Sequence, residues 1–173
     1  MRFSTIWIAT TLASVLGAGC GDDGGGDASS GKQTLGELSA AEVTTLCKSV
    51  QTKLDRLEKA FISIVCTDDA MFDEDTCTAE RKSCIADPPA EATLGEDANL
   101  ECDVDSDGSV TTECPKLTAD QLQGCLEAVV KTIETTAASY TCSADPDAFE
   151  EPATPKACRD LKSVCPMLSD FSG

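Results

Sequence analysis

The sequence predicts a mainly α-helical domain, stapled by disulfides and built from two tandem units, each a long helix followed by a short helix. Three observations predict this fold. Two helix-start motifs stand at equivalent places, and apolar residues at helical spacing follow each of them. Each predicted short helix carries two cysteines seven residues apart. The chain has eleven cysteines but only one Trp, one Tyr and five Phe, so we expect disulfides to stabilise a core that is poor in aromatic side chains.

The two long helices begin at capping boxes. Ser39 and Glu42 form the first Ser/Thr-x-x-Glu/Gln motif, and Thr118 and Gln121 form the second. In this motif the hydroxyl group and the carboxyl or amide group satisfy backbone N–H groups of the first helical turn. The apolar residues that follow recur at spacings of three and four, and we interpret them as core faces rather than as a partner-binding groove. They are Val43, Leu46, Cys47, Val50, Leu54, Leu57, Phe61 and Ile64 in the first helix, and Leu122, Cys125, Leu126, Val129, Ile133, Ala137 and Tyr140 in the second.

Each long helix is expected to end near a cysteine, Cys66 or Cys142, and an acidic loop then leads to a short helix. Pro155 is expected at the first position of the second short helix, where proline is favoured. Pro88 and Pro166 are expected to stop the two short helices, because proline cannot continue a helical hydrogen-bond ladder.

Helix geometry limits how the cysteines of the short helices can pair. Seven helical residues rise about 10.5 Å, whereas disulfide partners need Cα atoms within roughly 7 Å of each other. Cys77 is therefore not expected to bond Cys84, and Cys158 is not expected to bond Cys165. Each short helix should instead be bonded to other elements at both of its ends.

The cysteines of the long helices are subject to a related limit. Cys47 and Cys66 lie about 28 Å apart along a straight helix, so one short helix is not expected to reach both. We predict that Cys66 and Cys142 bond within their own units. The chain has no histidine and no Cys-x-x-Cys pair, which argues against zinc sites and thioredoxin-like redox centres. The ten cysteines expected to form disulfides are Cys47, Cys66, Cys77, Cys84, Cys102, Cys114, Cys125, Cys142, Cys158 and Cys165.

The connector between the units holds one motif with metal chemistry. Asp103, Asp105 and Asp107, followed by a glycine, resemble the start of an EF-hand-type calcium loop, in which alternating carboxylates converge on the cation and the glycine permits a sharp turn. Cys114 stands where that loop has its bidentate Glu, so we expect weak calcium affinity, with a dissociation constant of about 10⁻⁴–10⁻³ M. The calcium ligands that the resemblance implies are Asp103, Asp105, Asp107, Ser109 and Glu113.

The same stretch also fits a small β-hairpin. Asp107 and Gly108 form a turn signal, and Val104 and Val110 stand on the two arms. A disulfide between Cys102 and Cys114 would close this hairpin. We favour the hairpin as the structural interpretation, and it is compatible with cation binding.

The first twenty residues have the organisation of an export signal. Arg2 precedes an apolar stretch, residues 6–16, which is shorter than the about 20 residues that a membrane-spanning helix needs. The run Leu16-Gly17-Ala18-Gly19-Cys20 resembles the end of the signal peptide of bacterial lipoproteins. That resemblance implies cleavage before Cys20 and lipidation of this residue, for example with palmitate. Leu16 stands four residues before the cysteine where the family has three, which leaves cleavage by an ordinary signal peptidase after Gly19 as the alternative.

We therefore expect a signal peptide over residues 1–19, a Gly/Asp/Ser-rich flexible tether over residues 20–34 and one folded domain over residues 35–173. The expected divisions of that domain are a first repeat at about 35–89, a connector at 90–116 and a second repeat at about 117–173. The expected location is the outer membrane or the cell surface, with a soluble periplasmic or secreted protein as the alternative.

Charge and composition exclude several classes of function. Beyond the signal peptide the chain has 12 basic and 31 acidic residues, a net charge of −19, which argues against nucleic-acid partners. There is no histidine for a catalytic triad and no Gly-rich phosphate loop. We therefore predict a non-enzymatic, lipid-anchored envelope protein that is structural or binds a protein partner. The alternatives are a weak calcium-binding envelope protein and a secreted hydrolase with an acidic site.

Overall fold

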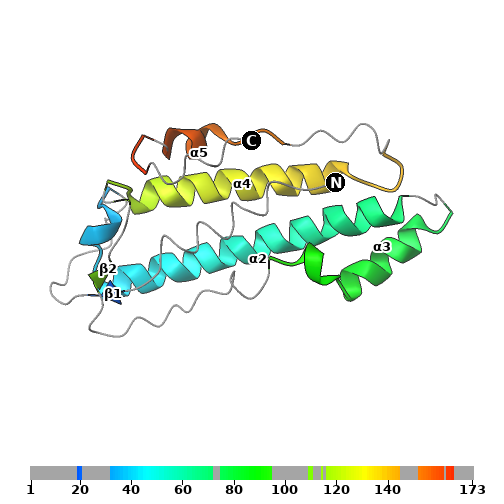
Figure 1. Ribbon diagram of the computed structural model, residues 1–173, viewed down its shortest axis with the longest axis horizontal. Coiled ribbons are helices and arrows are strands. Elements are labelled where there is room, and N and C mark those ends of the chain that lie inside the picture. The colour runs from blue at the N-terminus through cyan, green and yellow to red at the C-terminus, as the bar shows by residue number, and fades with distance from the viewer. Residues whose placement is uncertain are drawn as a thin grey trace.

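A computed structural model gives the structure of the chain, and the part it describes is mainly helical, as predicted (Figure 1). No helix within that part is both long and apolar enough to cross a membrane. The described residues are 32–71, 75–94, 114, 116–144, 152–161 and 163–165, together with the backbone of 19–20 and 109–110. The elements are β1 (Gly19–Cys20), the 3-10 helix η1 (Leu35–Glu37), α2 (Ala40–Ala70), α3 (Cys77–Ala86), the 3-10 helix η2 (Ala90–Ala92), β2 (Ser109–Val110), α4 (Ala119–Ser139) and α5 (Lys156–Leu161).

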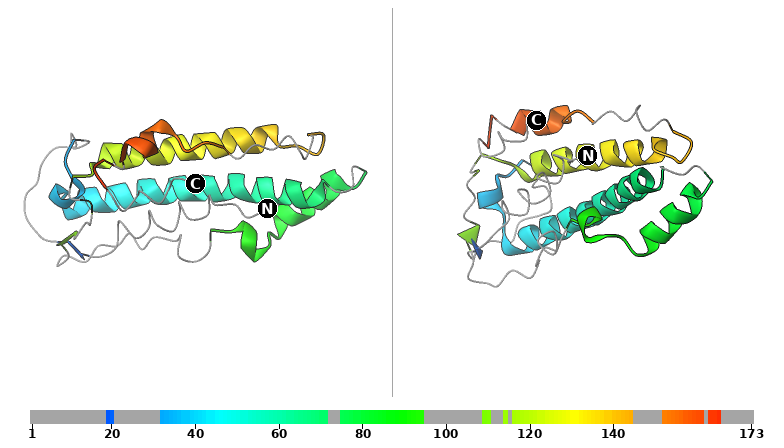
Figure 2. Two further views of the ribbon diagram at one scale, coloured as in Figure 1. Left: turned by 45° about the horizontal axis from the view of Figure 1, so that its top comes forward. Right: turned by 45° about the vertical axis from the view of Figure 1, so that its right-hand side comes forward.

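The long helices α2 and α4 lie side by side and run in the same direction (Figures 1 and 2). At the end where both begin, the backbone N–H of Leu35 donates to the carbonyl oxygen of Leu117 at 2.8 Å. At the other end, the hydroxyl of Tyr140 donates to Asp68 at 2.6 Å. Because the helices are parallel, their connection, residues 71–118, is a crossover from the end of α2 to the start of α4, and its described part includes α3 and η2.

Both predicted capping boxes are confirmed. The hydroxyl of Ser39 accepts the backbone N–H of Glu42 at 3.4 Å, and the Glu42 carboxylate accepts the backbone N–H of Ser39 at 2.8 Å. Thr118 and Gln121 make the same reciprocal pair at 3.3 and 3.0 Å. Each helix thus begins at the residue that the sequence predicts.

The apolar stripes of α2 and α4 face each other and form the core. Every predicted stripe residue is buried except Ala137, which is half-buried against the core cluster. Leu35 and Leu117, which lie outside the long helices, are also fully buried and close the core at the end where α2 and α4 begin.

The short helices pack on the outer sides of this pair, α3 on α2 and α5 on α4, in the order α3–α2–α4–α5 (Figure 2). They lie at opposite ends of the bundle. α3 folds back beside the end of α2, where Cys84 bonds Cys66, whereas α5 lies beside the beginning of α4, where Cys158 bonds Cys125.

Two predicted helix ends differ from the structure. α2 continues to Ala70, so Cys66 lies within the helix and not at its end. α5 ends at Leu161, well before the predicted stop at Pro166. The chain turns there, with the backbone N–H of Cys165 donating to the Leu161 carbonyl oxygen at 2.8 Å, and this turn leads Cys165 away from the helix and toward the connector.

The partner that the structure describes for the predicted hairpin arm at Val110 is a segment near the N-terminus. Ser109–Val110 form β2, which pairs antiparallel with β1, so that Cys20 lies opposite Ser109 and Gly19 lies opposite Val110. The expected second arm, which contains Val104, lies outside the described residues.

Candidate functional site

Disulfides join the helices of the described part at both ends of the bundle. As predicted, Cys77 does not bond Cys84 and Cys158 does not bond Cys165, and each of the four is bonded to another element. Cys47 is disulfide-bonded as well, to a partner outside the described side chains. The four bonds described in full are Cys66–Cys84, Cys77–Cys142, Cys114–Cys165 and Cys125–Cys158.

Two predicted pairings are wrong and one is confirmed. Cys66 bonds Cys84 within the first unit, as expected. Cys142 bonds Cys77 of the first unit, because α5 lies at the far end of α4 while the start of α3 lies beside residue 142. The predicted bond between Cys102 and Cys114 does not form, since Cys114 bonds Cys165.

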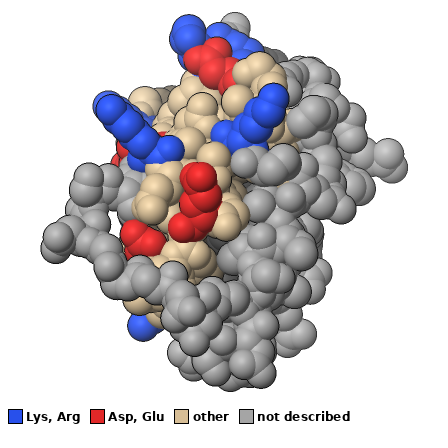
Figure 3. Space-filling model, turned by 90° about the vertical axis from the view of Figure 1, so that its left-hand side faces the viewer, with Lys and Arg blue, Asp and Glu red and all other residues tan. Residues whose placement is uncertain are grey.

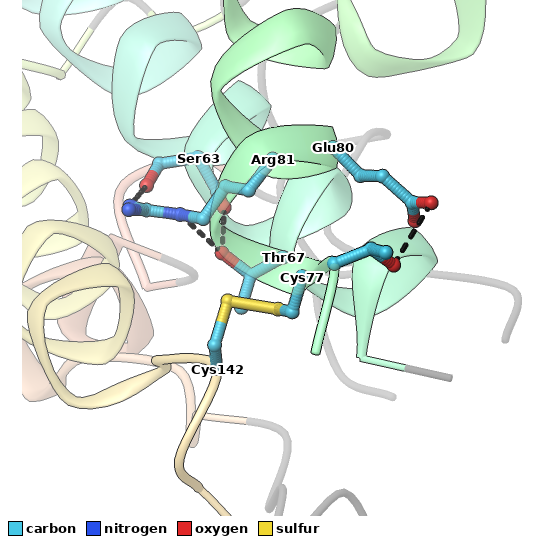
Figure 4. Close-up of a disulfide and its surroundings, with 7 residues drawn as sticks. Ser63, Thr67, Cys77, Glu80, Arg81 and Cys142 are labelled. Atoms are coloured by element: carbon cyan, nitrogen blue, oxygen red, sulfur yellow. Dashed lines mark hydrogen bonds between the residues drawn. A yellow bond between two sulfur atoms is a disulfide. The ribbon is translucent and has the colours of Figure 1, made fainter. Parts of the chain in front are cut away.

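The end of the bundle that holds α3 is fixed by two disulfides and a polar cluster, and we call it the clamped end. Figure 4 shows the polar cluster beside the Cys77–Cys142 bond. Arg81 reaches from α3 across α2, where its Nε donates to the Thr67 hydroxyl and its terminal nitrogen donates to the Ser63 hydroxyl, both at 2.8 Å. Thr67 is fully buried and also donates to the Ser63 carbonyl oxygen at 2.6 Å. Among the described residues Arg81 has no carboxylate partner, so its contacts attach α3 to α2 through hydroxyl groups. Glu80 points away from this cluster and accepts the Thr76 hydroxyl at 3.0 Å.

A charged cluster joins the middle of α2 to α4. Arg56 makes a bidentate pair with Glu134, at 3.0 Å from Nε and 2.8 Å from a terminal nitrogen, and also contacts Glu127 at 3.3 Å. Hydrogen bonds from Arg56 hold the pKa of Glu134 below its usual range, and those bonds raise the pKa of Arg56. The Nζ of Lys53 lies 3.9 Å from Oε2 of Glu127 at the edge of the same cluster.

Tyr140 is a buried polar contact between the same two helices near the clamped end. Its side chain is 4% exposed, and its hydroxyl donates to Asp68 at 2.6 Å. Burial, followed by this hydrogen bond, raises the pKa of Tyr140 above its usual range. The contact fixes the end of α4 against α2.

The opposite end of the bundle brings together segments that are distant in sequence, and we call it the tethered end. Thr34 forms an antiparallel bridge with Thr118, and its hydroxyl and backbone N–H both donate to Glu37, at 2.8 and 2.9 Å. β2 contacts η1 at this end and pairs with β1, which contains Cys20. Figure 3 shows the described surface here, where basic and acidic side chains are interspersed. The structure thus brings Cys20 and Ser109, two of the predicted site residues, to one place.

The other predicted calcium ligands, Asp103, Asp105, Asp107 and Glu113, lie outside the described residues, as does Cys102. Within the described residues, no group of three or more His, Cys, Asp or Glu side chains is arranged to hold a metal ion.

Sequence reasoning missed the polar contacts of the clamped end. Ser63 and Thr67 stand four residues apart on α2 and so share one helix face, next to the apolar stripe. This spacing is the sequence feature that could have indicated a polar patch on α2 able to hydrogen-bond a side chain from another element. Nothing in the sequence identifies Arg81 as that partner, because the pairing depends on how α3 folds back.

Comparisons with known proteins leave the family open: no protein-family model matches the chain, and neither the curated proteins nor the solved structures give a match.

Proposed function

We propose that this chain is exported, is anchored to the cell envelope by a lipid on Cys20, and presents a non-enzymatic helical module that is structural or binds a protein partner. One observation carries the proposal. All nine cysteines beyond residue 40 whose state is described are oxidised. Disulfides of this number form and persist in oxidising compartments, outside the cytoplasm. We propose that Cys102 completes this set as the partner of Cys47, which leaves Cys20, at the end of the export signal, for a different chemistry.

The anchor is tested by comparing the natural chain with its Cys20→Ala variant in bacterial cells fed a labelled fatty acid. We expect label on the natural chain, recovery of that chain with membranes, and loss of both for Cys20→Ala. Cys47→Ala is the matched control, because it also removes one cysteine but should keep the label. Membrane recovery of unlabelled natural chain, or a soluble natural chain, would contradict the proposed anchor.

A binding or structural role, and not catalysis, is supported by the contacts that the described polar side chains make within the bundle. Arg56, Arg81 and Tyr140 all make contacts between helices, so they stabilise the bundle. Crosslinking in intact cells followed by affinity capture should recover a reproducible protein partner or copies of the chain itself. Turnover of a panel of generic hydrolase substrates by the purified oxidised protein would favour the hydrolase alternative instead.

Calcium binding is the second candidate, and the Asp-x-Asp-x-Asp-Gly run favours it. A thermal melt of the mature protein with millimolar calcium and then with chelator tests it. Binding predicts a midpoint that rises with calcium in the natural protein and stays constant in an Asp103→Asn, Asp105→Asn double variant. An unchanged midpoint in the natural protein would rule the site out.

A further inference from the structure

We infer that the tethered end of the bundle faces the membrane and that the clamped end, with α3, is its outermost part. This inference rests on the proposed lipid anchor at Cys20. It adds an orientation, and therefore identifies which surface meets lipid headgroups and which is presented to partners.

The first observation is the place where the chain enters the folded part. Lys32, Thr34 and η1 lead directly into the start of α2, and Thr34 bridges to Thr118 at the start of α4. Because α2 and α4 are parallel, both helices begin at this end and both extend away from it (Figure 1). An anchor attached upstream of Lys32 therefore pulls on one end of the bundle.

The second observation is the position of Cys20 itself. Its backbone lies opposite Ser109 in the β1–β2 pair, and β2 contacts η1. The lipidated residue thus lies against the tethered end. Signal-peptide cleavage would remove Gly19 and leave Cys20 as the residue opposite Ser109.

Chain length gives an upper limit that is independent of this pairing. The twelve residue-to-residue steps from Cys20 to Lys32 span at most about 43 Å when fully extended. α2 has 31 residues and is about 46 Å long. The bond between Cys66 and Cys84 holds α3 roughly 39 Å along the axis of α2 from Ala40. The Gly/Asp/Ser-rich sequence of this stretch predicts a mean reach of about 20 Å, which is about half the distance to α3, so the clamped end lies beyond the mean reach of the anchor.

Charge does not set this orientation. Exposed residues of both signs flank the helix starts: Lys32, Glu37, Lys116 and Asp120. Figure 3 shows basic and acidic side chains together on this face. The covalent attachment and the position of Cys20 determine which end is near the lipid.

The orientation predicts which surface a partner meets. The exposed residues of α3 include Ile85, which is 42% exposed and is the one large apolar side chain exposed among the described residues. In the proposed orientation α3 lies on the side of the bundle that is farthest from lipid.

Tryptophan fluorescence gives a direct test, because the single tryptophan of the chain, Trp7, lies in the predicted signal peptide. Lys116→Trp places a probe at the tethered end and Lys82→Trp places one on α3. Both positions are exposed and both changes remove one positive charge. The lipidated proteins are bound to phosphatidylcholine–phosphatidylglycerol vesicles that carry a dansyl-headgroup lipid. We expect energy transfer to dansyl to be several-fold stronger from Lys116→Trp than from Lys82→Trp.

Two further measurements separate the possible failures. If the natural chain does not float with the vesicles, the anchor is absent and both the proposed function and the orientation are overturned. If it floats but the two probes transfer equally, or Lys82→Trp transfers more strongly, only the orientation is overturned. A second pair at other exposed positions, Lys32→Trp and Ser83→Trp, must give the same order, which guards against one variant that does not fold.

Discussion

Cys77, the first residue of α3, is bonded to Cys142, just beyond the end of α4, although 65 positions separate the two in the chain. Cys84, near the other end of α3, is bonded to Cys66 in α2. A ten-residue helix therefore connects the ends of both long helices.

Removing the Cys77–Cys142 bond should cost more stability than removing the Cys66–Cys84 bond. By chain entropy, closing a loop of 65 residues contributes about 4 kcal/mol, and closing a loop of 18 residues contributes about 3 kcal/mol. Denaturant unfolding of the two double-alanine variants, with the other bonds oxidised, measures the difference. The pairs are matched, since each combines one fully buried and one half-buried cysteine. A greater loss for the Cys66, Cys84 variant would contradict the proposed clamp.

Tyr140→Phe should lower the free energy of unfolding by about 1.5–3 kcal/mol, because it removes a buried hydrogen bond to a carboxylate. Asp68→Asn changes the acceptor of the same hydrogen bond, and its loss of unfolding free energy is measured in the same way. In a double-mutant cycle we expect the two losses to be less than additive, with a coupling of about 1 kcal/mol. Additive losses would show that the contact contributes nothing to stability.

The same tyrosine predicts how stability changes in alkali. The folded-state pKa of Tyr140 is raised, so its contribution is fully present below the unfolded tyrosine pKa of about 10 and is lost as the pH rises toward the folded value. The natural protein should therefore lose stability above about pH 10 more steeply than Tyr140→Phe. Equal slopes in unfolding titrations would contradict this.

Ser39→Ala should destabilise the protein by about 1 kcal/mol, because the capping hydroxyl at the start of α2 is lost. Thr52→Ala is the matched control. It removes a hydroxyl from an exposed position inside the same helix, where alanine is the better helix former, so its unfolding midpoint should stay the same or rise. If both variants lose the same stability, the capping box is not the cause.

Glu134→Gln should lower the melting temperature slightly at neutral pH and low salt, because it weakens the bidentate pair with Arg56. Both side chains are about 40% exposed, so high salt should screen the effect. The folded-state pKa of Glu134 is lowered, so its stabilisation is present above the ordinary carboxyl pKa and is lost as the pH falls through the folded value. A difference in melting temperature that persists in strong acid or high salt would indicate a packing effect instead.

The elements of this fold could be predicted because their signals are local. Ser39 and Thr118 mark helix starts through groups within three residues, and the stripes of α2 and α4 have a helical period. The exclusion of a Cys77–Cys84 bond also followed from one helix's own geometry.

The arrangement of those elements could not be predicted in the same way. The pairing of Cys142 depends on whether α5 or α3 lies beside it, and that is decided by how the helices pack together and not by the local sequence. The parallel direction of α2 and α4 and the contacts of Arg81 likewise depend on the crossover. Similarity between two repeats predicts similar units, but it does not predict that both are stapled in the same way.

Disulfide mapping by mass spectrometry of the protein purified from its membrane, with free thiols alkylated before digestion, is the most direct test. We predict the bonds Cys66–Cys84, Cys77–Cys142, Cys114–Cys165 and Cys125–Cys158, no alkylated cysteine, and a lipid on an N-terminal Cys20. Cys47, which is bonded, should then be linked to Cys102, the one cysteine left. A bond between Cys20 and Cys47, or free thiols among the ten other cysteines, would contradict the lipid anchor and the stapled bundle.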